Sequence, residues 1–177
     1  MSDNYRRVRF LFLGCALLVV VLDQITKFWV KANIPLGGSL PASGFFRLTH
    51  IQNTGAAWGI FQDSTLILAI ISGIASVLIL VLGLFMQRRI ELLGKTRVML
   101  ALGLILGGTI GNFIDRAFIG YVTDFLKMGT FPDYNIADSS IVVGGILLAY
   151  TVIRYTASEA PVGTSDTSCG RGPNQAA

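Results

Sequence analysis

The sequence predicts an all-α membrane protein with four transmembrane helices and a small extracytoplasmic β-rich element. Hydrophobic residues make up 53% of the 177-residue chain and charged residues only 14%, whereas charged residues are about a quarter of a typical soluble domain. Four apolar stretches also come close to the length that crosses a bilayer, about 17–25 residues. This composition excludes a disordered chain, a nucleic-acid-binding basic domain and most soluble enzymes. We interpret the net charge of +4 as loop charge facing anionic lipid.

We expect the four helices at about residues 10–30, 65–86, 98–115 and 138–155. The first stretch imitates a signal peptide, because arginines precede its apolar run. No small-x-small cleavage site follows that run, so we predict a helix that is retained. The second stretch contains no charged residue.

The segments at 32–64 and 116–137 connect these helices on one side of the membrane. Phe45–Gln52 is typical of a short strand, and the Asn-Thr-Gly that follows it is typical of a turn. The segment 120–126 is also strand-like. We therefore expect one domain over residues 1–156, followed by a disordered cytoplasmic tail at 157–177, which is rich in small and polar residues.

The distribution of Lys and Arg predicts the orientation. Nine of them lie in the N-terminal segment, the loop at 87–97 and the C-terminal tail, and five lie on the other side. Because cytoplasmic loops carry the excess of Lys and Arg, we expect both termini in the cytoplasm. The segments 32–64 and 116–137 should then face outward.

Polar residues at membrane depth are costly and need a reason. Asp23 and Lys27 lie four residues apart in the first helix, a spacing that suits either an ion pair or a place in a functional site. In the third helix, Gly108, Asn112 and Arg116 form one stripe that ends at the outer surface. Beside that stripe, overlapping G-x-x-x-G units at 103–111 predict a face for close helix packing.

Among the acidic residues, Asp124 and Asp138 are the candidates for chemistry near the outer boundary. If the segment between them doubles back, the two carboxyl groups can meet. Spacing alone favours ordinary structural roles for both residues. Asp138 would be the N-cap of the fourth helix, and Asp124 a surface strand residue. Asp63 and Asp133 are most simply solvated loop residues.

Five motifs in order between the four stretches make the chain recognisable. They are DQITK at 23–27, NTGAAWGIF at 53–61, GGTIGNFIDR at 107–116, VTDF at 122–125 and FPDYNIADSS at 131–140. Together they resemble the bacterial lipoprotein signal peptidase family, also called signal peptidase II, whose members are intramembrane aspartic proteases. The resemblance covers most of the chain except the tail.

The resemblance implies that Asp124 and Asp138 form the catalytic pair. The residues that would line the pocket or support this pair are Asp23, Lys27, Asn53, Gly108, Asn112, Arg116, Asn135 and Ala137. Asp115 belongs to a motif but not to the catalytic pair. The sequence departs from the family pattern at Trp58, where Phe is more usual, and at Asp133-Tyr134, where an apolar residue and Phe are common.

The function implied is an aspartic endopeptidase that removes the signal peptide from diacylglyceryl-modified prolipoproteins, cutting just before the lipidated cysteine. Two carboxyl groups sharing one proton would activate water, and no cofactor or metal is expected. The expected partners are lipid-modified prolipoproteins and membrane phospholipid, without nucleic acid. The protein should be a monomer of the bacterial inner membrane with its active site at the outer face.

A small ion- or proton-coupled transporter is the main alternative, because intramembrane Asp, Lys and Asn residues also mark ion paths. It predicts polar residues near the bilayer midplane and an inverted repeat, whereas the charges of this chain gather toward one surface. A non-catalytic assembly factor that docks partners on its outer segments is a further alternative.

Overall fold

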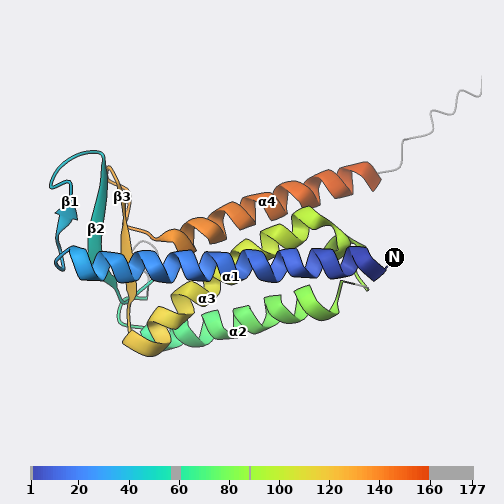
Figure 1. Cartoon of the computed structure of the whole chain (residues 1–177), viewed down its shortest axis with the longest axis horizontal. Helices are drawn as coiled ribbons and strands as arrows, with labels where there is room; N and C mark the ends of the chain where they lie inside the picture. The colour runs from blue at the N-terminus through green and yellow to red at the C-terminus, as the bar shows by residue number, and fades with distance from the viewer. Residues whose placement is uncertain (1, 57–60, 88, 160–177) are drawn as a thin grey trace, which may run out of the picture.

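A computed structural model describes residues 2–56, 61–87 and 89–159, and it confirms the predicted fold class (Figure 1). Four helices in this part of the chain are long and apolar enough to cross a membrane. The helices are α1 (Ser2–Asn33), α2 (Thr65–Phe85), α3 (Thr96–Ile119) and α4 (Ile136–Glu159), with a short 3₁₀ helix, η2 (Glu91–Gly94), before α3. The strands are β1 (Ser39–Leu40), β2 (Phe46–Asn53) and β3 (Val122–Met128).

Three helices extend beyond the expected ranges. α1 begins at Ser2, eight residues before the expected start, because polar and basic residues continue the helix past its apolar part. α3 continues to Ile119 and ends at Gly120, which has a left-handed φ of 80°, so Arg116 belongs to the helix rather than to the segment after it. α4 runs to Glu159, slightly into the predicted tail, and the remaining tail residues lie outside the described part of the chain.

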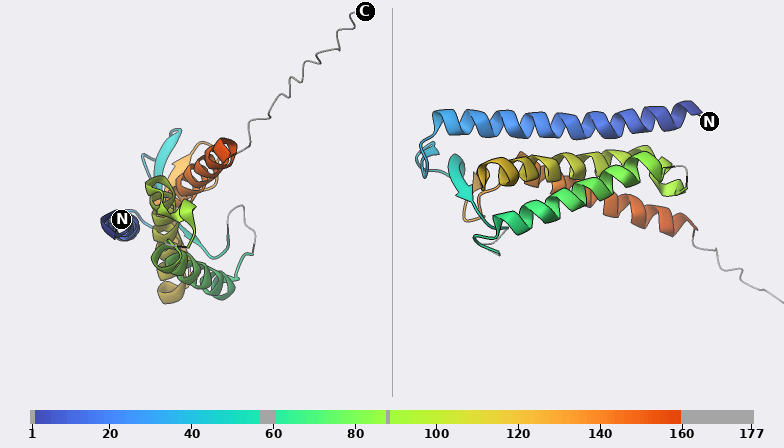
Figure 2. Two further views of the ribbon diagram at one scale, coloured as in Figure 1. Left: turned by 90° about the vertical axis from the view of Figure 1, so that its right-hand side faces the viewer. Right: turned by 90° about the horizontal axis from the view of Figure 1, so that it is seen from below.

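The helix α3 is the centre of the bundle and packs against α1, α2 and α4 (Figure 2). The predicted glycine face lies against α1: a Cβ atom at Gly107 would lie 2.6 Å from the carbonyl oxygen of Ala16, and one at Gly103 would lie 2.8 Å from that of Phe12. These contacts confirm that the glycines permit close helix approach. Phe12 and Met99 form part of the buried core between α1 and α3.

A three-stranded antiparallel sheet in the order β1-β2-β3 caps the end of the bundle opposite the N-terminus (Figure 1). The strands β2 and β3 pair from Phe46 opposite Met128 to Asn53 opposite Val122, with a register shift between Leu48 and Ile51. A small core of Val30, Ile34 and Phe125 packs the sheet against the end of α1. Both longer strands were predicted to within two residues at each end. This sheet brings β3 beside the start of α4.

Candidate active site

The first candidate carboxylate, Asp124, lies on β3 with only 3% of its surface exposed. The interpretation of Asp124 as a surface strand residue is therefore wrong. β3 is covered on both sides here, which the sequence YVTDFL does not reveal. Asp124 accepts hydrogen bonds from Asn53 Nδ2 at 2.9 Å and from Asn135 Nδ2 at 2.8 Å. Two side-chain amides therefore fix the orientation of this carboxyl group.

The second candidate, Asp138, lies in the first turn of α4. The backbone N–H of Asp138 donates to Asn135 Oδ1 at 2.9 Å, and the backbone N–H of Asn135 donates to Asp138 Oδ2 at 3.2 Å. This reciprocal pair is a capping box in which Asn135, not Asp138, is the N-cap. The N-cap interpretation of Asp138 is therefore wrong by three residues. Asp138 is left with its other oxygen, Oδ1, for further contacts.

Two asparagines connect the carboxylates. Besides donating to Asp124, Asn135 Nδ2 donates to Asn112 Oδ1 at 3.2 Å, and Asn112 Nδ2 donates to Asp138 Oδ1 at 2.7 Å. Asn135 and Asn112 are both buried. Asp124 and Asp138 are thus joined by two short routes, directly through Asn135 and through Asn135 with Asn112.

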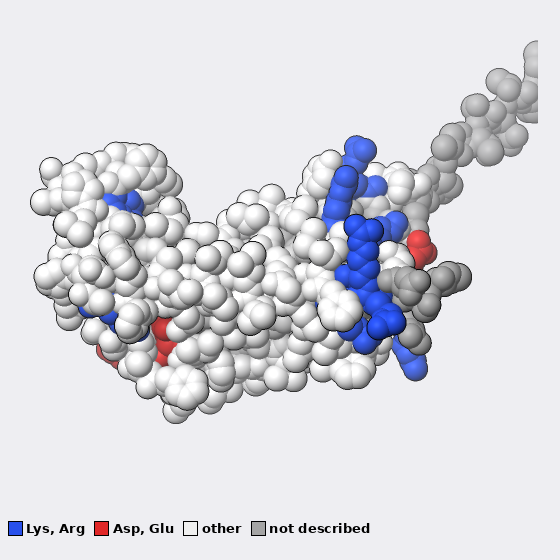
Figure 3. Space-filling view, in the orientation of Figure 1, with Lys and Arg blue, Asp and Glu red and all other residues white. Residues whose placement is uncertain are grey.

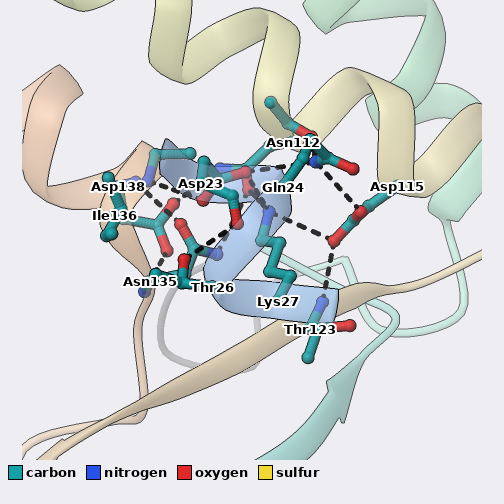
Figure 4. A network of polar contacts seen from close by, with 12 residues as sticks. Asp23, Gln24, Thr26, Lys27, Asn112, Asp115, Thr123, Asn135, Ile136 and Asp138 are labelled. Carbon is teal, nitrogen blue, oxygen red and sulfur yellow. Dashed lines mark hydrogen bonds and ion pairs between the residues drawn. The ribbon is translucent and has the colours of Figure 1, made fainter. Parts of the chain in front are cut away.

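A fully buried lysine orients the amide of Asn112 (Figure 4). Lys27 Nζ donates to Asn112 Oδ1 at 3.1 Å and forms ion pairs with Asp23 Oδ2 at 2.8 Å and Asp115 Oδ2 at 3.1 Å. The ion pair expected from the spacing of Asp23 and Lys27 is confirmed, and it is also one part of a larger network. Because the Lys27 ammonium can only donate, Asn112 must present its oxygen to Lys27 and its NH₂ group to Asp138.

The two carboxylates around Lys27 connect α1 and α3 to the elements that carry Asp138 and Asp124. Asp23 Oδ1 accepts the backbone N–H of Ala137 at 3.0 Å, which links α1 to the start of α4. Asp115 Oδ2 accepts the backbone N–H of Thr123 at 3.0 Å, which links α3 to β3 beside Asp124.

The remaining predicted site residues lie around this network. A Cβ atom at Gly108 would overlap the carbonyl oxygen of Ala137, so a glycine is needed where α3 crosses α4. Arg116 Nη2 donates to the carbonyl oxygen of Gly55 at 2.9 Å, which holds the segment after Asn53 against α3. Every residue that the resemblance implied thus lies in one cluster. Trp58 lies outside the described residues.

Burial raises the pKa of Asp124 to about 7, and the nearby negative charge of Asp138 adds to this effect. The hydrogen bonds from Asn53 and Asn135 oppose the increase. At neutral pH, Asp124 is therefore divided between its protonated and ionised forms.

A cleft of 1120 Å³ contains both carboxylates. One part of its wall is apolar and belongs to α4, at Ile141, Val142 and Val143. Other lining residues come from the sheet, the segments next to it and α3, and they include Asn53, Arg116, Asp124 and residues 130–134. The cleft can therefore hold an apolar chain beside a polar group at Asp124 and Asp138.

The contacts of two residues near the site, Gln24 and Asp133, were missed or misread from the sequence. Gln24 Nε2 donates to Asp23, to Asp115 and to the carbonyl oxygen of Gly111, at 3.2–3.4 Å. Nothing in the motif GNFIDR indicates that Asp115 has a partner in α1. Asp133 is not a solvated residue, because it is paired with Lys127 at 2.9 Å and with Thr49 at 2.5 Å.

Comparisons with known proteins agree on one family. Residues 15–154 match the family model described as signal peptidase (SPase) II. The chain is 42% identical over 154 residues to the lipoprotein signal peptidase of Dehalococcoides mccartyi strain BAV1, covering 86% of this chain and 94% of that protein. It is 41% identical to the lipoprotein signal peptidase of Bacillus subtilis strain 168, covering 78% and 90% of the two chains.

A solved structure of a bacterial membrane enzyme, determined by the in meso method, has a similar fold. It superposes with a TM-score of 0.75 at 31% sequence identity, covering 84% of this chain and 90% of that one. A second such structure gives a TM-score of 0.70 at the same identity.

Proposed function

The chain belongs to the signal peptidase II family, which makes it an aspartic protease of the membrane, and we propose that it removes the signal peptide from diacylglyceryl-modified prolipoproteins. The family supports prolipoprotein processing and does not favour the transporter alternative. The observation that carries the dyad mechanism is that Asn135 contacts Asp124 through its amide and Asp138 through a capping box, within one cleft.

We assign the resting proton of the dyad to Asp124, because burial and the neighbouring carboxylate raise its pKa. We assign the role of base to Asp138, whose oxygens accept N–H groups from Asn112 and from the backbone at the N-terminal end of α4. The two groups titrate as a coupled pair, so the roles of acid and base belong to their joint state.

In the first step, Asp138 takes a proton from water while the water oxygen attacks the scissile carbonyl carbon. Asp124 gives its proton to the carbonyl oxygen, and a neutral tetrahedral diol forms. In the second step, the C–N bond breaks and the amine nitrogen takes a proton from Asp138. A hydroxyl proton of the diol returns to Asp124 as the carboxyl group of the signal peptide forms. The dyad again holds one proton, and no acyl-enzyme is formed.

The cleft supports the proposed substrate. The apolar wall from α4 would contact the signal peptide or the acyl chains, whereas the polar side would hold the peptide near the dyad. Cleavage just before the lipidated cysteine places the cut bond at the membrane boundary, which matches the position of the dyad where the helices meet the sheet. Arg116 and Asn112 would bind the peptide or the lipid backbone.

The orientation is part of the same proposal. Lys and Arg side chains gather at the end of the bundle that carries the N-terminus (Figure 3). Cytoplasmic loops carry such an excess, so we place this end in the cytoplasm of a bacterial inner membrane. The sheet and the dyad then face outward. We also expect a monomer in contact with membrane phospholipid.

The test is single-turnover cleavage in detergent of a diacylglyceryl-modified prolipoprotein, with an unlipidated prolipoprotein as the control substrate. Asp124→Asn and Asp138→Asn should each lose almost all cleavage, and the double variant should be no worse than either single variant, because the two groups act as one unit. Asp63→Asn is the matched control, since Asp63 is exposed and an amide can still accept from Thr54. Substantial turnover by either dyad variant would contradict the mechanism.

A further inference from the structure

The connection between β3 and α4 carries a polar clamp centred on Asp133. Asp133 Oδ1 accepts the hydroxyl of Thr49 on β2 at 2.5 Å, and Oδ2 accepts Lys127 Nζ on β3 at 2.9 Å. The side chains of Asp133 and Lys127 are 16% and 20% exposed, and Thr49 is buried. The pair is therefore better shielded than a surface ion pair, which contributes little.

The clamp lies between the two segments that carry the dyad. Lys127 follows Asp124 by three residues on the same strand, and Asp133 precedes Asn135 by two residues. Tyr134, between Asp133 and Asn135, forms a backbone bridge to Leu126 on β3, with N···O distances of 2.7 and 3.1 Å. The side chain of Asp133 thus attaches the connection between β3 and α4 to the sheet, and this connection also places Asn135 against Asp124.

We propose that Asp133 is a positioning residue that sets the separation of the two dyad carboxyl groups by holding residues 130–135 against β2 and β3. This inference rests on the proposed function, because it assumes that Asp124 and Asp138 act together. Asn135 is the link: its Nδ2 contacts Asp124, and its backbone N–H and Oδ1 contact Asp138. A displaced connection moves Asn135 and changes the geometry at both carboxylates.

The contacts of Asp133 give a physical reason for an acidic residue at this position, where an apolar residue is common in the family. Thr49 lies within the register shift between Leu48 and Ile51, where the ladder between β2 and β3 is interrupted. Asp133 supplies a hydrogen-bond acceptor at this interruption and compensates the ammonium of Lys127. An apolar residue at 133 would leave the buried Thr49 hydroxyl and the Lys127 charge without this partner.

The experiment measures kcat and KM for lipidated prolipoprotein with Asp133→Asn, Lys127→Met and the double variant. Asp133→Asn keeps an acceptor for Thr49 but loses the ion pair. We expect kcat to fall about tenfold in each single variant with KM within twofold, since misplacement of catalytic groups by a fraction of an ångström impairs chemistry before binding. The double variant should fall no further than the single variants. Glu91→Gln, which removes an exposed carboxylate at the opposite end of the bundle, should keep wild-type values.

A thermal unfolding midpoint in detergent accompanies each assay. A wild-type kcat in Asp133→Asn, or additive losses in the double variant, would overturn the proposal. So would a loss of kcat that disappears when the assay temperature is lowered in step with the unfolding midpoint, since that result indicates a purely structural role. Failure of the proposed function is distinguished by Asp124→Asn: if that variant still cleaves, the dyad mechanism fails whatever Asp133 does.

Discussion

Replacement of Gly108 by alanine tests whether close contact between α3 and α4 holds the dyad in place. The added Cβ atom would overlap the carbonyl oxygen of Ala137 and lie 2.8 Å from Ile141 Cγ1. The oxygen belongs to the backbone of the first turn of α4, next to Asp138, and cannot move aside as a flexible side chain would. Restoring ordinary van der Waals contact requires the two helices to separate by about 1 Å.

This separation should affect both the stability of the protein and its catalytic rate. Overpacking of this kind costs about 1–3 kcal/mol of stability, partly offset by the gain of up to about 1 kcal/mol from the higher helix propensity of alanine. A misplacement of about 1 Å can lower a catalytic rate on the order of 100-fold. Gly108→Ala should therefore fold, unfold a few degrees lower than wild type, and lose far more activity than stability.

The assay is single-turnover cleavage of lipidated prolipoprotein, together with thermal unfolding in the same detergent. Gly145→Ala is the matched control, because a Cβ atom at Gly145, also in α4, meets no atom within 4 Å. It should be as active as wild type and at least as stable. Wild-type activity in Gly108→Ala would refute the argument that contact between α3 and α4 fixes the dyad.

The remaining predictions concern charge and orientation. Burial raises the pKa of Asp124 from about 4 to about 7, so its protonated form favours the fold. The contribution of Asp124 to the free energy of unfolding should therefore be most favourable below pH 4, fall as pH rises to 7, and change by no more than about 4 kcal/mol. Asp124→Asn should therefore raise the thermal unfolding midpoint at pH 8 and hardly change it at pH 4, and an equal change at both pH values would contradict the raised pKa. Wild-type cleavage should also decline above about pH 7, as Asp124 loses its proton. Lys27→Met leaves the buried carboxylates of Asp23 and Asp115 without their cation, so it should lower the free energy of unfolding in detergent by about 3–5 kcal/mol. Adding Asp115→Asn to this variant should restore part of the lost stability. An unchanged unfolding midpoint in Lys27→Met would show that the network does not stabilise the fold. In a background without native cysteines, a membrane-impermeant thiol reagent added outside should label a cysteine at residue 40 and not at 91, and labelling at 91 would reverse the proposed orientation.

The helical part of the fold was accessible from the sequence because its signals are local. Long apolar runs identify membrane spans whatever their partners, and G-x-x-x-G spacing identifies a packing face on a single helix. The pair of Asp23 and Lys27 was likewise visible, since four residues separate neighbours on one helix face. The helix ends were not, because α1 and α4 continue through polar residues that no longer carry an apolar signal.

The site was only partly accessible because its contacts join distant segments. Lys27 meets Asn112 and Asp115 from α3, more than 80 residues away in the chain, and no spacing rule reaches that far. Spacing alone also favoured ordinary structural roles for Asp124 and Asp138. The resemblance of five motifs, not the periodicity of the chain, identified these two residues as a pair.

The placement of the charged network explains how an apolar bundle can position a polar site. Gly111 allows the Asp23 carboxylate to approach α3, since a Cβ atom there would lie 2.6 Å from Asp23 Oδ2 and 3.3 Å from Ala137 Cβ. This approach lets Asp23 reach the backbone N–H of Ala137 while it pairs with Lys27. A buried charge without its partners is strongly destabilising, so a shift of α1, α3 or α4 would break several contacts at once. The cost of burying the network is therefore also what ties helix packing to the separation of Asp124 and Asp138.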